Sequence, residues 1–288
     1  MNNYEIMMNG YIQIGEVAPD FEADTTLGKI KLSDYKGKWI VLFSHPGDFT
    51  PVCTTEIIAF ARMNTYFEKL NTQLIGLSID SINSHLAWIC DIFLKTGIEI
   101  SFPIIADRSG EIARKYGMIA PNISRTSTVR NVFIIDDKGI IRLILIYPMN
   151  IGRNISEIIR VINALQVADK NDKMAPANWV PCDQMIVPSP QDFYELKKRV
   201  NELKNEKNGM SWYLSFQKPD FCSTEDIQNL NFESRFNLSE KNKNFENNNI
   251  NMSTNINKKN NNTQERESKT TSTNINKVRN KTIYWKNF

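Results

Sequence analysis

The amino-acid sequence predicts an α/β fold, in which helices cover both faces of a β-sheet. Short stretches of β-branched and apolar residues alternate along the chain with longer stretches that have helical periodicity. Two later apolar stretches are separated by the turn DDKG at residues 136–139, which is typical of an antiparallel hairpin. The 288 residues, 41% of them hydrophobic, are enough for one sizeable core.

Each predicted element has a local signal. The expected strands lie at residues 39–44, 73–79, 102–106, 128–135 and 140–147, and the expected helices at residues 51–70, 84–94, 109–116 and 154–165. Gly139 supplies the positive φ that the hairpin turn needs. The last of these helices begins near Asn154, and Glu157 three residues later is typical of a capping box. This order of elements is the one expected of a thioredoxin-like fold.

The amino-acid composition divides the chain into three segments. Residues 1–168 form the expected thioredoxin-like domain, and residues 169–222, which are rich in proline, form a smaller second domain with one helix at 191–206. Residues 223–288 hold 18 Asn among 66 residues and repeat the sequence STNINK. We expect this tail to be disordered, because it has too few apolar residues to offset its ordering entropy.

Charge and cysteine content exclude several classes of function. The tail carries 11 basic and 7 acidic residues, whereas residues 1–222 carry 24 and 25, so we expect no nucleic-acid-binding face. The sequence has no apolar run of 18 residues and no signal-peptide pattern at its start, so we expect a cytoplasmic protein that does not bind membranes. The four cysteines include no CxxC pair, so the sequence predicts neither a zinc site nor a disulfide framework.

One cysteine lies where a helix is expected to begin. Thr50 is a typical N-cap residue, and Pro51 is well suited to the first helical position because its φ is already helical. Cys53 then falls in the first turn, where free N–H groups and the helix dipole favour an anion. We therefore expect a lowered thiol pKa and a nucleophilic thiolate. Helix geometry alone leaves open the alternative of an inert, buried cysteine.

The residues around Cys53 resemble the active site of the peroxiredoxins. Pro46, Thr50 and Cys53 fit the signature PxxxTxxC, and SHPGDFTPVCTTE is similar to the form found in the one-cysteine, peroxiredoxin 6-type subfamily. The similarity extends over about residues 12–220 and leaves only the tail outside. Two-cysteine members have proline after the catalytic cysteine and carry a later VCPxxW motif. Here Thr54 follows Cys53 and no such motif exists.

The resemblance implies a role for each residue of the signature. The thiolate of Cys53 attacks one peroxide oxygen, while negative charge develops on the leaving oxygen. By resemblance, Arg130 stabilises the thiolate and the transition state, and Thr50 hydrogen-bonds the peroxide. Pro46 shields Cys53 from water and over-oxidation. For His45, a peroxide-pocket or structural hydrogen bond is favoured over a general-base role, since a thiolate needs no base.

Other residues receive weaker assignments. Glu56 is expected to pair with an arginine of the site, and Arg153 is a second candidate for that cluster. His85 and Trp88, at helical spacing, are interpreted as packing residues, and Cys90 as part of the core. Cys182 stays undecided, and the resemblance does not imply a resolving role for Cys222. Lys38 occupies the place of the serine with which some relatives cleave phospholipids, so we expect no phospholipase activity.

The sequence thus predicts a thiol-dependent peroxidase that reduces hydrogen peroxide and alkyl hydroperoxides through a sulfenic acid at Cys53. The resemblance implies no metal, haem or flavin, an external thioredoxin-, glutaredoxin- or glutathione-type reductant, and a homodimer or ring of dimers joined through the second domain. A thioredoxin-type disulfide reductase is disfavoured because it needs a CxxC pair. A non-catalytic holdase or scaffold is disfavoured because Pro46, Thr50, Cys53 and Arg130 are all present.

Overall fold

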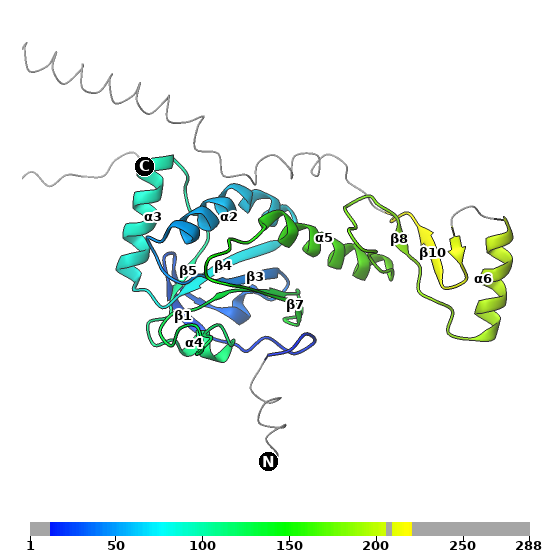
Figure 1. The fold of residues 1–288 in the computed structure, drawn as a ribbon, viewed down its shortest axis with the longest axis horizontal. Coiled ribbons are helices and arrows are strands. Elements are labelled where there is room, and N and C mark those ends of the chain that lie inside the picture. Colours follow the sequence, from blue (N-terminus) through cyan, green and yellow to red (C-terminus); the bar gives the residue numbers. More distant parts are fainter. Residues whose placement is uncertain (1–11, 206–208, 221–288) are drawn as a thin grey trace, which may run out of the picture. The chain divides into compact units, whose positions relative to one another are not determined.

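The computed structural model describes residues 12–205 and 209–220 and centres on a seven-stranded sheet (Figure 1). The strand order is β2-β1-β5-β4-β3-β6-β7. Strands β3, β4 and β5 run parallel, whereas β1, β6 and β7 pair antiparallel with their neighbours. The strands are β1 (Glu22–Thr25), β2 (Gly28–Lys31), β3 (Trp39–Ser44), β4 (Thr72–Ser78), β5 (Ile104–Ala106), β6 (Arg130–Ile135) and β7 (Ile141–Tyr147).

Helices cover both faces of this sheet, as predicted. They are α2 (Pro51–Lys69), α3 (Ile82–Thr96), α4 (Glu111–Lys115) and α5 (Ile155–Asn171), with the short 3-10 helix η1 (Leu32–Tyr35). In Figure 1, α2 and α5 lie on one side of the sheet and α4 on the other. Side chains alternate along β3: Val41 and Phe43 pack with α2, α3 and α5, whereas Ile40 and Leu42 pack with α4. The α/β, thioredoxin-like fold is therefore confirmed.

Two local predictions are confirmed by backbone geometry. Gly139 has φ of 84° in the turn between β6 and β7, where the backbone N–H of Gly139 donates to the carbonyl oxygen of Asp136. At the start of α5, the side chain of Asn154 accepts a hydrogen bond of 3.3 Å from the backbone N–H of Glu157, which confirms the N-cap. The carboxylate of Glu157 accepts hydrogen bonds from Arg160, so the second half of the expected capping box is not the contact that forms. Turn and cap residues can thus be identified in this chain before its structure is known.

The hairpin β1–β2 and helix η1 were not predicted. The two strands have the sequences EADT and GKIK, which are largely polar and largely exposed, so they carry no strong apolar alternation. The hairpin depends on Gly28, whose φ is 100°, and on a 2.6 Å hydrogen bond from Thr25 Oγ1 to the Gly28 carbonyl oxygen. Local turn chemistry, not hydrophobic pattern, stabilises this edge of the sheet.

The C-terminal part of the described chain contains a smaller sheet. Its order is β8 (Met185–Ile186), β10 (Leu214–Gln217) and β9 (Gly209–Ser211), and helix α6 (Phe193–Asn205) lies between β8 and β9 in the sequence. Trp179, which is 1% exposed, packs with Met185 and with Ala164 of α5. None of the described helices is both long enough and apolar enough to cross a membrane. The tail, for which disorder is predicted, lies outside the described residues.

Candidate active site

The loop of residues 45–50 connects β3 to α2 and leads directly to Cys53. Pro51 is the first residue of α2, as predicted, and Cys53 is the third. Thr50 lies at the N-cap position, as predicted, but its side chain makes no capping hydrogen bond. Thr50 Oγ1 instead donates to the carbonyl oxygen of Gly47 over 2.8 Å. The hydroxyl thus ties the loop to itself rather than to the helix.

A guanidinium group lies against the sulfur of Cys53. The thiol is 1% exposed, and Arg130 Nη1 lies 3.3 Å from Sγ. Arg130 is the first residue of β6, and its Nε and Nη2 donate to the Met149 carbonyl oxygen over 3.0 and 2.5 Å. The predicted contact between Cys53 and a positive charge is therefore present.

Glu56 lies one helical turn after Val52 and joins two arginines. Its Oε2 accepts hydrogen bonds from Arg130 Nη1 at 2.6 Å and from Arg153 Nη2 at 2.8 Å. Its Oε1 accepts from both the backbone N–H and Nε of Arg153 at 2.8 Å. The predicted pairing of Glu56 and the membership of Arg153 in the cluster are both confirmed.

Arg153 is enclosed on every side by protein. Its Nη1 donates to the carbonyl oxygens of Ser44 and Asn131 at 2.9 and 3.0 Å. The rings of Phe43 and Phe60 lie 5.2 and 5.5 Å from the guanidinium carbon, close enough for cation–π contact. Arg153 therefore connects the end of β3, the start of β6 and helix α2 in a site closed to water.

Charge balance in this cluster favours an additional anion. Burial alone would raise the pKa of Glu56, but the hydrogen bonds and charges of Arg153 and Arg130 outweigh burial and lower it. The carboxylate is therefore ionised, and two buried guanidinium groups face one buried carboxylate. The remaining positive charge lies on Arg130, the residue that contacts Cys53. A thiolate at Cys53 would neutralise the cluster.

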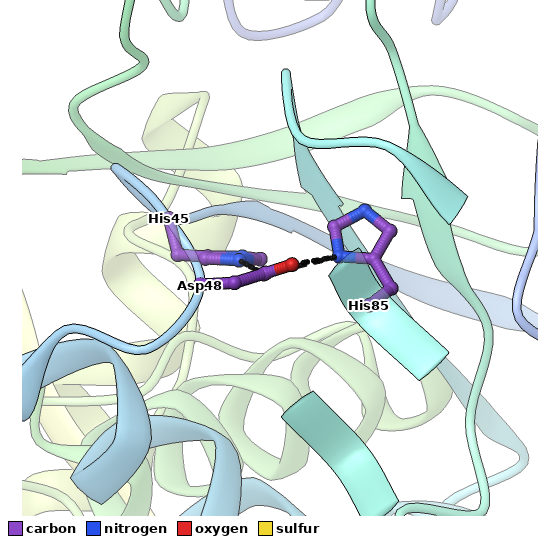
Figure 2. A group of neighbouring side chains, drawn as sticks. All are labelled: His45, Asp48 and His85. Atoms are coloured by element: carbon purple, nitrogen blue, oxygen red, sulfur yellow. Dashed lines mark hydrogen bonds and ion pairs between the residues drawn. The ribbon is translucent and has the colours of Figure 1, made fainter. Parts of the chain in front are cut away.

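A second buried polar group holds the other side of loop 45–50 (Figure 2). His45 Nε2 lies 3.0 Å from Asp48 Oδ1, and His85 Nδ1 of α3 lies 2.9 Å from Asp48 Oδ2. All three side chains are at most 2% exposed. Burial lowers the pKa of His45, whereas the hydrogen bonds from both imidazoles hold the pKa of Asp48 far below its usual value despite burial. Asp48 is therefore a carboxylate, and His45 is neutral.

His85 and Trp88 do more than pack. Both are buried on the inner face of α3, as predicted, but His85 also bonds Asp48, and Trp88 Nε1 donates to Thr54 Oγ1 over 3.2 Å. One ring nitrogen of His45, one ring nitrogen of His85 and one carboxylate oxygen of Asp48 lie within 4.8 Å of one another. This spacing would also allow them to be ligands of a divalent cation. Sequence reasoning missed this cluster, although Asp48 lies inside the motif, because the contact joins residues 37 positions apart.

Two of the other three cysteines, Cys90 and Cys182, lie within the described residues. Cys90 is exposed on α3, so its assignment to the core was wrong. Cys90 lies two residues after the buried Trp88. Two residues rotate by about 200° around a helix, so Cys90 faces solvent. Cys182 has φ of 75° and is disulfide-bonded. The prediction that the cysteines form no disulfide framework must therefore be corrected, because their scattered spacing gives no sign of this bond. Cys222 lies outside the described residues.

The buried Glu56 predicts a measurable pH dependence of stability. Its folded pKa is lowered, so the stability that it contributes is present above its unfolded pKa and lost as pH falls through the folded value. Glu56→Gln should lower the free energy of unfolding by about 3 kcal/mol at neutral pH and flatten its decline below about pH 5. Denaturant unfolding at a series of pH values measures both effects.

Glu157→Gln is the matched control, since Glu157 also pairs with an arginine but is 38% exposed. It should cost at most about 1 kcal/mol. Equal losses in the two variants would contradict a special role for the buried pair.

Comparison with known proteins gives the family. Residues 14–144 match the AhpC/TSA family, and residues 164–203 match the C-terminal domain of 1-Cys peroxiredoxin. The chain is 59% identical over 206 residues to "Peroxiredoxin 2" of Caldanaerobacter subterraneus subsp. tengcongensis, covering 72% of this chain and 93% of that protein. It is 54% identical to a peroxiredoxin of Aquifex aeolicus, covering 66% of this chain and 90% of that protein.

Solved structures agree with this result. A structure of yeast mitochondrial 1-Cys peroxiredoxin has a TM-score of 0.63 and 44% identity, covering 72% of this chain and 99% of that one. A cysteine-to-serine mutant of peroxiredoxin 6 of Arenicola marina has a TM-score of 0.60 and 42% identity, covering 65% of this chain and 88% of that one. The chain belongs to the peroxiredoxin family and is a thiol-dependent peroxidase.

Proposed function

We propose that Cys53 is the residue that reduces the peroxide. The observation that carries the proposal is the 3.3 Å contact between Arg130 Nη1 and Cys53 Sγ. The thiolate attacks one oxygen of the hydroperoxide, the O–O bond breaks, and the leaving oxygen takes a proton to become water or an alcohol. Cys53 is left as a sulfenic acid. A positive charge beside the reacting sulfur stabilises both the thiolate and the charge that develops on the peroxide.

Thr50 is proposed to accept a hydrogen bond from the peroxide O–H rather than donate one. Its hydroxyl hydrogen is already committed to the Gly47 carbonyl oxygen, at 2.8 Å, so its lone pairs are what it can offer a substrate O–H. Pro46 is proposed to shield Cys53 from water, and His45 to contribute a hydrogen bond in the peroxide pocket. His45 suits this role because its Nδ1 is buried without a hydrogen-bond partner among the described residues.

An external thiol is proposed to regenerate Cys53. The sulfenic acid condenses with one thiol to give a mixed disulfide and water, and a second thiol then releases the reduced cysteine and leaves as a disulfide. The related yeast structure is described as explaining thiol resolution through glutathione and thioredoxin systems. A thioredoxin-, glutaredoxin- or glutathione-type reductant is therefore proposed here. Cys182, which is held in a disulfide, is not free to supply that thiol.

A homodimer or ring of dimers, and a cytoplasmic location, complete the proposal. The match to the C-terminal domain of 1-Cys peroxiredoxin supports an assembly role for the region that follows α5. The proposal includes no metal, haem or flavin, no nucleic acid and no membrane. A holdase or scaffold function is not favoured, because the chain is similar to peroxiredoxins and Arg130 contacts Cys53 as a reactive thiolate would require.

Replacing the sulfur tests the assignment of Cys53. Cys53→Ser should abolish peroxide consumption in the presence of excess dithiol, because the hydroxyl is not ionised at neutral pH, while the circular dichroism spectrum stays that of the wild type. Activity within about tenfold of wild type would contradict the proposal.

Replacing the guanidinium tests the role of Arg130. Arg130→Met removes a fixed positive charge from beside the sulfur, so it should lower the fraction of Cys53 present as thiolate at neutral pH. The rate of peroxide reduction should fall at least about tenfold. Ultraviolet absorbance of the thiolate measures the first effect and stopped-flow oxidation the second. If both stayed at wild-type values, Arg130 would have no catalytic role.

Removing the other three cysteines tests the one-cysteine mechanism. Simultaneous replacement of Cys90, Cys182 and Cys222 by serine should leave turnover with a small dithiol within about threefold of wild type, since the dithiol itself resolves the sulfenic acid. A loss of turnover that returning Cys222 alone restores would show that this cysteine resolves Cys53.

A further inference from the structure

Asp48 is the residue at which loop 45–50 is held from two sides. Its backbone N–H donates to Asp80 Oδ2 over 3.0 Å, and Asp80 in turn accepts a 2.7 Å hydrogen bond from Ser78 Oγ at the end of β4. Its carboxylate lies between the rings of His45 and His85, as Figure 2 shows. The loop is therefore tied through its backbone to the strand beside it and through a side chain to α3.

Each ring nitrogen of His85 lies close to a buried oxygen atom. Nδ1 lies 2.9 Å from Asp48 Oδ2, and Nε2 lies 3.2 Å from the carbonyl oxygen of Ile105 in β5. The ring is 0% exposed, so both contacts are buried. His85 is therefore fixed at both ring nitrogens, between the Asp48 carboxylate and the backbone of β5.

The contact between His85 and Asp48 lies next to a strained residue of loop 45–50. Phe49, the next residue after Asp48, has φ of 55°, a left-handed conformation that costs a residue with a bulky side chain about 1 kcal/mol or more. Phe49 is 56% exposed, so packing of its own side chain does not impose this conformation. Contacts on either side of it do: Asp48 is bound to His85, and Thr50 Oγ1 is bound to the Gly47 carbonyl oxygen.

We propose that His85 is a positioning residue for peroxide reduction. The His85 ring holds Asp48, Asp48 holds the turn at Phe49, and the turn places Pro46 and Thr50 beside the first turn of α2, where Cys53 lies. His85 itself contacts neither the sulfur nor the substrate. The inference rests on the roles proposed above for Pro46 and Thr50.

The test measures single-turnover oxidation of reduced protein by hydrogen peroxide in the wild type, His85→Gln, Asp48→Asn and the double variant. Each single substitution should slow oxidation at least about tenfold, because small displacements of groups that orient a substrate are costly. The double variant should be no more than about threefold slower than the slower single variant, since both changes break the same contact. Circular dichroism establishes that each protein is folded at the temperature used.

Ile92→Val is the matched control. Ile92 lies on the same buried face of α3 and is 2% exposed, but it packs in the apolar core. It should lose about 1 kcal/mol of stability and keep the wild-type rate within about twofold. This control separates loss of positioning from general destabilisation of the helix.

Two results would overturn the inference: a loss of less than about tenfold in either single variant, or losses that multiply in the double variant. If His85→Gln does not fold, Asp48→Asn provides the test, because it preserves the shape of the side chain and removes the carboxylate that contacts His85. If the oxidation rate of that variant is less than about tenfold below the wild-type rate, the proposal is overturned. Failure of the proposed function would look different, since wild-type Cys53 itself would not react.

Discussion

A single buried carboxylate, Glu56, connects the parts of the chain that make up the active site. It lies on α2 and binds both Arg130 at the start of β6 and Arg153 just before α5. A buried ion pair stabilises a protein only when its hydrogen bonds are complete, and here both carboxylate oxygens are used. Removing Glu56 would leave two guanidinium groups unpaired in a site without water. The position of Arg130 against Cys53 therefore depends on this one residue.

Two buried acids flank the residues that enclose the sulfur. Glu56 follows Cys53 in the chain and binds two guanidinium groups, whereas Asp48 precedes Cys53 and binds two imidazole rings. The Glu56 cluster pairs one carboxylate with two guanidinium groups, which leaves one positive charge next to Cys53. Attraction for an anion is thus concentrated at the sulfur. The other acid serves geometry, because it fixes loop 45–50.

Much of this arrangement is visible in the sequence, and the remainder has physical reasons for being hidden. The motif identifies Cys53, and apolar periodicity places the strands and helices around it. The contact between His85 and Asp48 joins residues that are distant in the chain, and no local pattern reports such a pair. Thr50 was correctly placed at the helix start, but its hydroxyl has two possible partners, and only the loop geometry decides between them. The short polar strands β1 and β2 lack apolar alternation altogether.

The most direct test of this account compares two reactions of the same sulfur in Glu56→Gln. Alkylation by iodoacetamide depends on the amount of thiolate, whereas oxidation by hydrogen peroxide also needs a correctly placed Arg130. The account predicts that the substitution slows oxidation by hydrogen peroxide at least about tenfold more than it slows alkylation at the same pH. Equal changes in both rates, or a wild-type rate of oxidation, would contradict the claim that Glu56 positions Arg130 for the reaction.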